Sequence, residues 1–494
     1  MLFLSILGEN KKGGFPMKAT RFLALVLAIM MMLCAFSVAG AETAKRTIVV
    51  DGGGDWQNFN STKSMEKSDA NPYPYNELEM LIKEYNELHP DVEVQLLPDS
   101  KTTEREAVVA LMTAGEAPDI IFQNMGVYKN TDIGTDWFVP LNDYFEQPNP
   151  YEEGNTRWAD VFNPMWLEVT RSSNGNYYFC PIDAVPAGLM VNMDLLKQAG
   201  IEKVPETFAE FMDAQDKLNE IGVIPYLPLY HWFDIVLEGQ MLSSKVEELD
   251  VLQKDGVLDS QEFARAITKG LLSTSDPEYQ EYFRLIKEVT KYFPDDWQNI
   301  DVMTAFLNGE IAMSAGVGAH MRQVVNDTVH TFEAVNAPFP LVTEETSEFG
   351  KIAVIRGSAG YSTTWQVTNT AVKNDTVDIC IDFLMYLTSA ENNARMVNTF
   401  ETTTPANVSA ECIDMFKPLN DIAKKDMEAG YLDWHACNIW NAWDNELSTN
   451  YNDLRLGWIL DEISLEDFTA DFQYELEAAV ERAMENSGWD ETTW

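Results

Sequence analysis

Short runs of β-branched and aliphatic residues alternate with amphipathic segments along the first part of the chain. The runs at 47–51, 92–97 and 119–122 are bounded by Gly or Pro, which predicts three strands. Apolar residues recur at three- and four-residue spacing over 76–89 and 103–114, which predicts a helix between each pair of strands. Strands that alternate with helices in this way predict a parallel sheet with helices on both faces.

The same alternation resumes later in the chain. A strand at 190–192 and a helix over 194–200 precede a second helix, for which Thr207 and Glu210 have the spacing of a capping box. A final amphipathic helix is predicted over 465–486. Because 494 residues exceed what one hydrophobic core usually holds, the sequence predicts two packed units.

The first 41 residues are typical of an export signal. Lys18 and Arg21 precede an uncharged apolar run at 22–38, and small residues follow it. This pattern predicts cleavage after Ala41 and a true start at Met17. No second apolar span is long enough to cross a membrane.

Five cysteines bear on anchoring and on disulfides. Cys34 suggests a lipid anchor, but the bulky residues at 31–33 differ from the small residues that such a site needs, so secretion or retention by the uncleaved helix is favoured. The other four, which an exported chain could pair in any combination, are Cys180, Cys380, Cys412 and Cys437.

The charge of the chain narrows the range of partners. The chain has 79 Asp and Glu against 34 Lys and Arg, a formal charge of -45. Such a surface repels phosphate backbones, which argues against nucleic-acid binding. A solvated acidic surface is the simplest interpretation, and an acidic cleft for a cationic ligand is the alternative.

Searches for catalytic and metal motifs find none. The sequence lacks G-x-S-x-G, H-E-x-x-H, a phosphate-binding loop and a dinucleotide fingerprint. No two of the five His have metal-ligand spacing, and no C-x-x-C pair is present. The sequence therefore predicts no catalytic residue, no cofactor and no metal site.

Several segments, taken in order, resemble one family. The segment ALMTAGEAPDII at 110–121 resembles the helix, turn and strand of bacterial extracellular solute-binding proteins of family 1, the maltose-binding protein class. Segments similar to others of that family follow in the same order at 137–144, 175–181, 190–201, 205–208, 305–313, 338–340 and 383–389.

The resemblance implies an α/β, two-lobed, periplasmic-binding-protein-like (type II) fold. Each lobe is expected to hold a mainly parallel sheet flanked by helices, and hinge crossings are expected near 181–186, near 336–340 and after Leu387. The implied first lobe comprises 46–182 and 338–388, and the second comprises 183–337 and 389–494. A ligand would lie between the lobes, and their closure would present it to an importer.

Sugars present C–H faces and hydroxyl rims, so sugar sites combine aromatic rings with Asp, Asn and amide groups. In the family that the chain resembles, the position of Trp56 faces the ligand, and Asp55 and Asn58 lie beside it. The other candidates, each with a structural role as its alternative, are Asn124, Asp183, Trp232, Gly316, Trp365, Trp440 and Trp443. Asp183 is expected either to bind ligand or to tie the hinge, and Gly316 to approach the ligand through its backbone.

The resemblance therefore implies a monomeric receptor for a small solute, a carbohydrate first of all. Its protein partners would be the transmembrane permease subunits of an ABC importer. A binding protein for a cationic or other non-sugar solute, a secreted carbohydrate-active enzyme and a sensor that reports to a kinase are the alternatives.

Overall fold

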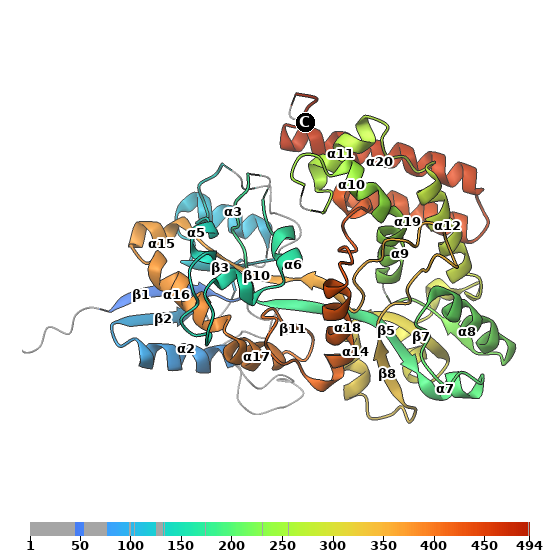
Figure 1. Cartoon of the computed structure of the whole chain (residues 1–494), viewed down its shortest axis with the longest axis horizontal. Coiled ribbons are helices and arrows are strands. Elements are labelled where there is room, and N and C mark those ends of the chain that lie inside the picture. The colour runs from blue at the N-terminus through green and yellow to red at the C-terminus, as the bar shows by residue number, and fades with distance from the viewer. Residues whose placement is uncertain are drawn as a thin grey trace, which may run out of the picture.

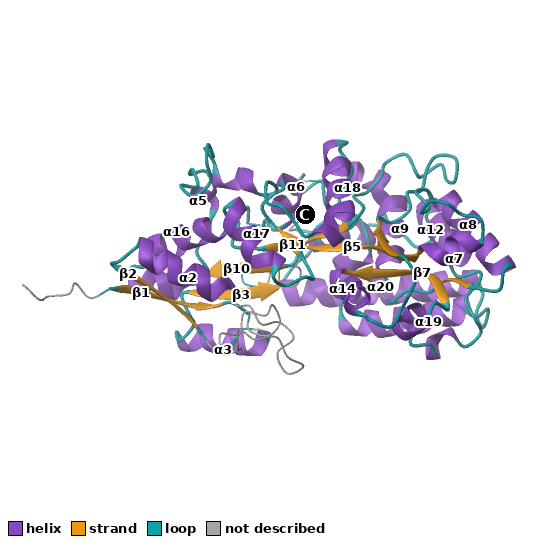
Figure 2. Ribbon diagram, turned by 90° about the horizontal axis from the view of Figure 1, so that it is seen from below, coloured by secondary structure: helices purple, strands orange, loops and turns teal. Residues whose placement is uncertain are grey.

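The computed structural model contains two lobes, each built around its own β-sheet (Figure 1, Figure 2). It describes residues 45–53, 77–97, 100–102, 104–124, 132, 134–172, 174–229, 231–254, 256–492 and 494. The predicted signal segment lies outside these residues. The two-lobed α/β fold that the sequence implied is confirmed.

The first lobe, on the left of Figure 1, contains a five-stranded sheet in the order β2-β1-β3-β10-β4. Its strands are β1 (Arg46–Asp51), β2 (Val92–Leu96), β3 (Ile120–Asn124), β4 (Cys180–Pro181) and β10 (Thr363–Val367). β1 pairs in parallel with β2 and β3, whereas β10 runs antiparallel to β3 and β4. The first sheet is therefore mainly parallel, as predicted.

Helices cover both faces of this sheet, because successive strand residues point to opposite sides. Ile120 belongs to the core that includes α2 (Glu77–Leu88), and Ile121 to the core that includes α3 (Arg105–Ala114). Figure 1 shows these two helices on either side of the sheet. The other helices of this lobe are α5 (Asn142–Phe145), η2 (Trp158–Val161), α6 (Pro164–Val169), α15 (Asn369–Asn374), α16 (Val377–Leu387) and α17 (Ala390–Asn398).

The second sheet is built around the ten-residue strand β5 (Asp183–Asn192). Its other strands are β6 (Ile224–Tyr226), β7 (Ile311–Val317), β8 (Ala334–Ala337), β9 (Ser358–Tyr361) and β11 (Thr404–Pro405). β5 is antiparallel to β7, β8, β9 and β11, and only β6 and β7 pair in parallel. In each sheet one strand, β10 in the first and β5 in the second, runs against its partners, and the other strands of that sheet share one direction.

Local capping signals place the helix ends of the second lobe where the sequence predicted them. Thr207 accepts from the Glu210 N–H at 3.2 Å, and the Glu210 carboxylate accepts from the Thr207 N–H at 3.3 Å, which starts α8 (Phe208–Glu220). Ser464 caps α20 (Leu465–Ser487) in the same way. The remaining helices of the second lobe are α7 (Met193–Gln198), α9 (Trp232–Leu242), η3 (Ser243–Lys245), α10 (Val246–Leu249), α11 (Ser260–Thr268), α12 (Pro277–Val289), η4 (Trp297–Asn299), α13 (Val302–Leu307), α14 (Gly318–Asn326), η6 (Ile439–Ala442) and α19 (Asn445–Ile459). Within the described residues, no helix is both long and apolar enough to cross a membrane.

Three chain segments connect the lobes, and they pair with one another in a short antiparallel ribbon. Ala184, at the start of β5, pairs with Tyr361 of β9 and with Thr404 of β11. Thr363, two residues after Tyr361, begins β10 of the first sheet. The ribbon β9-β5-β11 is therefore the structural junction between the lobes, and Figure 1 shows β5 passing from it into the second lobe.

A helix braces this ribbon. η5 (Asp414–Phe416) leads into α18 (Lys417–Glu428), which contacts β5, β8 and β9. The Arg356 guanidinium donates to both carboxylate oxygens of Asp426 in α18 at 2.9 and 3.0 Å, and both side chains are largely buried. This ion pair ties the second crossing to the third.

The second and third crossings lie later in the chain than we expected. Val354 packs in the core of the second lobe and Ile355 in that of the first, so the second crossing lies there rather than near 336–340. α17 packs in the first core, so the third crossing follows this helix rather than Leu387. We therefore propose to move the lobe boundaries from 337 to 354 and from 388 to a point beyond Ala406, which also packs in the first core.

Candidate functional site

The strand ends of both sheets face the ribbon between the lobes. β3 ends at Asn124, whose partner Thr363 is bonded to Asp183 at the start of β5. β7 ends at Val317, which pairs with Ala187, further along β5. Because the strand rises about 3.3 Å per residue, Asp183 and Ala187, and with them the two strand ends, lie about 13 Å apart along β5. Because α/β sheets bind ligands at the carboxyl ends of their strands, the candidate site lies between these two edges.

A buried carboxylate organises the edge of the first lobe. Asp51, the last residue of β1, accepts from the Gly53 N–H at 3.1 Å, the Ser100 hydroxyl at 2.7 Å and the Lys101 N–H at 2.5 Å. Gly53 has φ +97, and a Cβ there would lie 2.9 Å from the Phe122 ring. Only glycine suits this turn, in conformation and in space. The turns after β1 and β2 are therefore fixed to each other at the candidate site.

Two polar residues end β3. The backbone of Asn124 pairs with Thr363, and the side chain of Asn124 lies outside the described residues. Gln123 is 3% exposed, and its Nε2 has no hydrogen-bond partner in the part of the chain that the structure describes. Gln123 is therefore an amide donor at this edge that the sequence analysis did not select.

The edge of the second lobe begins with a stacked pair of tryptophans. The Leu229 N–H donates to the Ala315 carbonyl at 3.3 Å, so the chain after β6 runs beside β7 and brings Trp232 to the edge. The Trp232 ring is half-buried and stacks on Trp434, with ring centroids 5.6 Å apart and planes at 19°. Trp434 is 1% exposed and acts as the support. A Cβ at Gly239 would lie 2.1 Å from the Trp434 carbonyl oxygen, so glycine allows this close packing.

A second pair of tryptophans follows on the same chain segment. Trp440 and Trp443 are half-buried and stack with centroids 4.6 Å apart and planes at 28°. Glu238 of α9 holds this segment, because one of its carboxyl oxygens lies 3.1 Å from both the Ile439 nitrogen and the Tyr279 hydroxyl. Burial raises the pKa of Glu238 to about 8. The two stacked pairs are thus fixed to one helix.

The charged groups near Trp232 are paired. Asp234 and Arg455 are both buried and form an ion pair, and His231 Nδ1 lies 3.6 Å from Asp234. Burial is the largest influence and acts to raise the pKa of Asp234, but Arg455 and His231 together outweigh it, so the pKa is lowered. Asp234 therefore offers no unpaired negative charge to a cationic ligand.

Three of the predicted contact residues lie inside the protein. Trp365 is 0% exposed and packs in the first core. Asp183 is fully buried and accepts from the Thr363 N–H at 2.8 Å and hydroxyl at 3.0 Å, and burial raises its pKa to about 6. Gly316 is buried, and a Cβ there would lie 3.1 Å from the Met190 Cε and 3.2 Å from the His320 Cβ, a close approach to which these side chains would have to adjust. Trp365 and Asp183 thus take the structural roles that the sequence left open as alternatives.

The remaining candidates are three residues outside the described part of the chain and three tryptophans of the second lobe. Trp56, Asp55 and Asn58 lie outside the described residues, so their roles stay predictions. The structure brings Trp232, Trp440 and Trp443 together in the second lobe through α9 and the 434–443 segment.

Sequence reasoning missed three residues that shape the site. Asp51 and Gln123 stand at strand ends, so their position was a usable signal. Glu238 left no signal, because burial does not distinguish one acid among 79 in the sequence alone.

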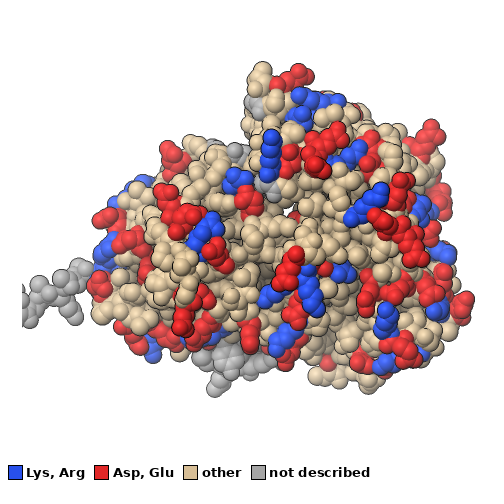
Figure 3. Space-filling model, viewed as in Figure 1, with Lys and Arg blue, Asp and Glu red and all other residues tan. Residues whose placement is uncertain are grey.

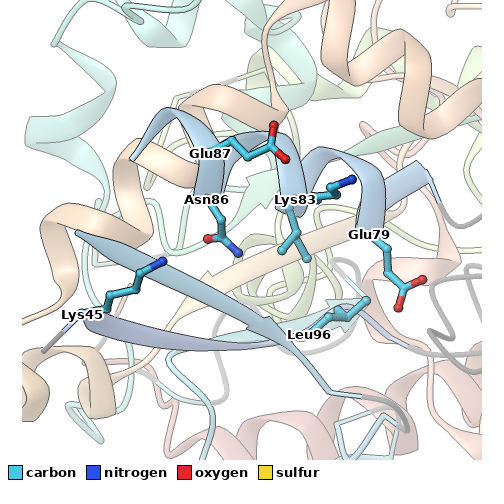
Figure 4. A pocket seen from close by; sticks show the side chains of 7 residues that line it. Lys45, Glu79, Lys83, Asn86, Glu87 and Leu96 are labelled. Atoms are coloured by element: carbon cyan, nitrogen blue, oxygen red, sulfur yellow. The ribbon is translucent and has the colours of Figure 1, made fainter. Parts of the chain in front are cut away.

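The surface agrees with a site between the lobes. Figure 3 shows the molecule hollowed between its two halves. A pocket of about 450 Å³ lies elsewhere, between α2 and the outer strands β1 and β2 (Figure 4). Its lining includes Lys45, Lys83 and Asn86 and comes from the first lobe alone, so it is not the site defined by the two edges.

Comparisons with known proteins agree with this architecture. A sequence model of the family described as bacterial extracellular solute-binding protein matches residues 80–425. A family 1 extracellular solute-binding protein from Bifidobacterium longum subsp. infantis has 15% identity and a TM-score of 0.61, with 88% of this chain and 100% of that chain covered. Apo RafE from Streptococcus pneumoniae has 15% identity and a TM-score of 0.61, with 89% and 100% covered. A cyclo/maltodextrin-binding protein complexed with maltotetraose has 13% identity and a TM-score of 0.62, with 90% and 99% covered.

Proposed function

Since the chain belongs to the family of bacterial extracellular solute-binding proteins, we propose that it binds a sugar or oligosaccharide between its lobes and delivers it to an ABC importer. In this proposal the chain is exported and works outside the membrane as a monomer, and the permease subunits are its protein partners. Binding and release need no covalent chemistry.

The observation that carries the proposal is the pair of tryptophan stacks at the second edge. Trp232 and the Trp440–Trp443 pair are only half-buried, although their supports Trp434 and Glu238 are buried. An exposed aromatic face on a rigid support suits the C–H face of a sugar ring. Gln123, across the ribbon, supplies an amide that suits a hydroxyl rim.

Lobe closure follows from a ligand that contacts both edges. The edges belong to different lobes and lie on either side of the ribbon, so a ligand between them stabilises the closed arrangement. The ligand acts on the importer through this closed form.

Isothermal titration of the purified chain against a carbohydrate library, with tryptophan fluorescence alongside, tests the proposal. A saturable signal with at least one sugar is expected. Trp232→Ala should weaken that affinity by about tenfold or more. Trp297→Ala is the matched control, since Trp297 is also half-buried but packs on Phe293, against a different core cluster from that of Trp232.

Other outcomes point to other functions. A polyamine that binds where every sugar fails would replace the sugar by a cationic solute. Product formed from a bound saccharide would make the chain an enzyme. Equal losses of affinity in Trp232→Ala and Trp297→Ala would show that the aromatic edge, formed by Trp232, Trp434, Trp440 and Trp443, is not part of the site.

A further inference from the structure

A loop in the second lobe gathers carboxylates around a calcium-like sequence pattern. Gly256, between α10 and α11, is followed by five residues and then Glu262, which matches the second half of the helix–loop–helix calcium pattern D-x-[DN]-x-[DN]-G-x5-E. Val251 and Gln253 stand at the first two ligand positions of that pattern, and Gln253 still offers an amide oxygen. Asp255 fits the pattern in sequence and lies outside the described residues. The spacing of His and Cys residues in the sequence does not reveal a metal site that is built of oxygen donors.

The loop folds back over a buried carboxylate. Glu262 is 0% exposed, and its Oε1 accepts from the Leu252 N–H at 2.5 Å and the Gln253 N–H at 3.3 Å. Its Oε2 is also buried and has no hydrogen-bond partner among the described residues. A buried carboxylate oxygen without a donor is costly, and a cation is a partner that would satisfy it.

Two more carboxylates lie close to Glu262. Asp250 accepts from the Lys254 and Gly256 N–H groups at 2.6 and 2.7 Å, and Asp259 accepts from the Glu262 N–H at 3.0 Å. Burial, together with the charges of Asp259 and Asp250, raises the pKa of Glu262 to about 7.

No ion pair among the described residues neutralises this group of charges. Asp250, Asp259 and Glu262 form no ion pair with Lys, Arg or His there, and the Arg265 Nη1 on the next turn of α11 is itself without a partner. The loop therefore carries negative charge with no cationic group bonded to it.

We propose that the 250–262 loop binds one calcium ion through Glu262 and the neighbouring Asp250 or Asp259. Calcium takes six to eight oxygen ligands in flexible geometry, so main-chain carbonyls, the Gln253 amide and water can complete its shell. In the described part of the chain, no three Asp, Glu, His or Cys side chains already form a complete metal group, so the ion draws the second carboxylate away from its N–H partners. Zinc is disfavoured because the loop has no Cys or His.

A bound ion would support the proposed binding edge. The Leu258 N–H donates to the Ala436 carbonyl at 2.7 Å, and Leu258 is buried in the second core. Ala436 lies in the segment that carries Trp434 and Trp440. The loop is therefore tied to the aromatic edge, although calcium binding itself does not depend on the identity of the solute.

Calcium titration of the full purified chain tests the proposal. After treatment with EDTA and exchange into chelator-free buffer, isothermal titration should show one ion per chain, with a dissociation constant at or below about 1 mM. Saturating calcium should raise the unfolding midpoint by about 3 °C or more, and magnesium at the same ionic strength by less. Glu262→Gln should weaken calcium binding by about tenfold or more. Glu247→Gln, which removes an exposed acid of α10, should leave binding unchanged.

The calcium titration of the wild type tests the proposal even if Glu262→Gln does not fold. Asp250→Asn serves as the second variant. Absence of saturable binding up to about 10 mM calcium, well above the range of extracellular calcium modules, would overturn the proposal. Wild-type affinity in both variants would also overturn it, and an equal response to magnesium would reject calcium as the ion.

Discussion

Replacing Glu238 by Gln tests whether a buried carboxyl group holds the aromatic edge. Glu238 is 2% exposed and lies within hydrogen-bond distance of the Ile439 nitrogen and the Tyr279 hydroxyl. Burial raises its pKa from 4.5 to about 8. Gln has nearly the same shape and keeps an acceptor for the Ile439 N–H, but it does not ionise.

The pKa shift fixes the sign and the size of the effect. Between pH 4.5 and pH 8 the folded chain keeps a proton that the unfolded chain has lost, so this group makes the free energy of unfolding fall as the pH rises. Between about pH 5 and pH 8 the fall is about 3 kcal/mol for one such group. Glu238→Gln lacks this dependence and should gain about 3 kcal/mol on the wild type over the same range.

Urea unfolding followed by tryptophan fluorescence at several pH values measures the difference. Asp183 and Glu262 also titrate, but they are present in both proteins, so their contributions cancel when the curves are subtracted. Glu247→Gln, an exposed change in the same lobe, should give a curve parallel to the wild type. A constant difference between Glu238→Gln and the wild type from pH 5 to pH 8 would refute the reasoning.

Three further changes probe the packing and the junction. Gly239→Ala should destabilise the second lobe by about 2 kcal/mol, measured by urea unfolding, because the added Cβ would lie 2.1 Å from the Trp434 carbonyl oxygen. A variant as stable as the wild type would show that α9 can move aside. Asp183→Asn should remove the loss of stability that this group causes as the pH rises from 3.8 to about 6, so thermal scans should show the variant gaining stability relative to the wild type between these two pH values. Arg356→Met should lower the free energy of unfolding by about 3 kcal/mol, because it leaves the buried Asp426 carboxylate unpaired. Adding Asp426→Asn to the same chain should restore part of that loss. A double variant no more stable than Arg356→Met would show that the ion pair does not carry the effect.

The helices and strands that the sequence predicted have local signals. The capping box of Thr207 and Glu210 involves residues three apart, and Ser464 caps the last helix in the same way. The strands at 47–51 and 92–97 are short runs rich in β-branched and aliphatic residues between turn residues. By contrast, β11 has two residues and exists only because it pairs with β5. The junction therefore lies beyond the reach of local patterns.

The candidate site shows the same division. Trp232 and Trp365 both follow or occupy strands, and the sequence left both open between ligand contact and a structural role. β10 is buried along its whole length although it contains Thr and Gln, so its composition does not reveal the burial of Trp365. Trp232 begins a helix at the sheet edge, and its exposure depends on the distant Trp434 beneath it. Long-range packing decides which tryptophan reaches the surface.

Three buried acids show how the structure fixes its irregular segments. Asp183, Glu238 and Glu262 all have raised pKa values, which often mark catalytic groups. Each of them, however, lies within hydrogen-bond distance of a main-chain nitrogen where two segments meet: the crossing at Thr363, the aromatic segment at Ile439 and the loop at Leu252. Because a raised pKa means that each acid lowers stability once the pH exceeds its unfolded value, stability does not explain these residues. Their positions do, since a binding protein needs rigid loops at its two edges, and a buried acceptor can hold a main-chain N–H where no helix or strand does.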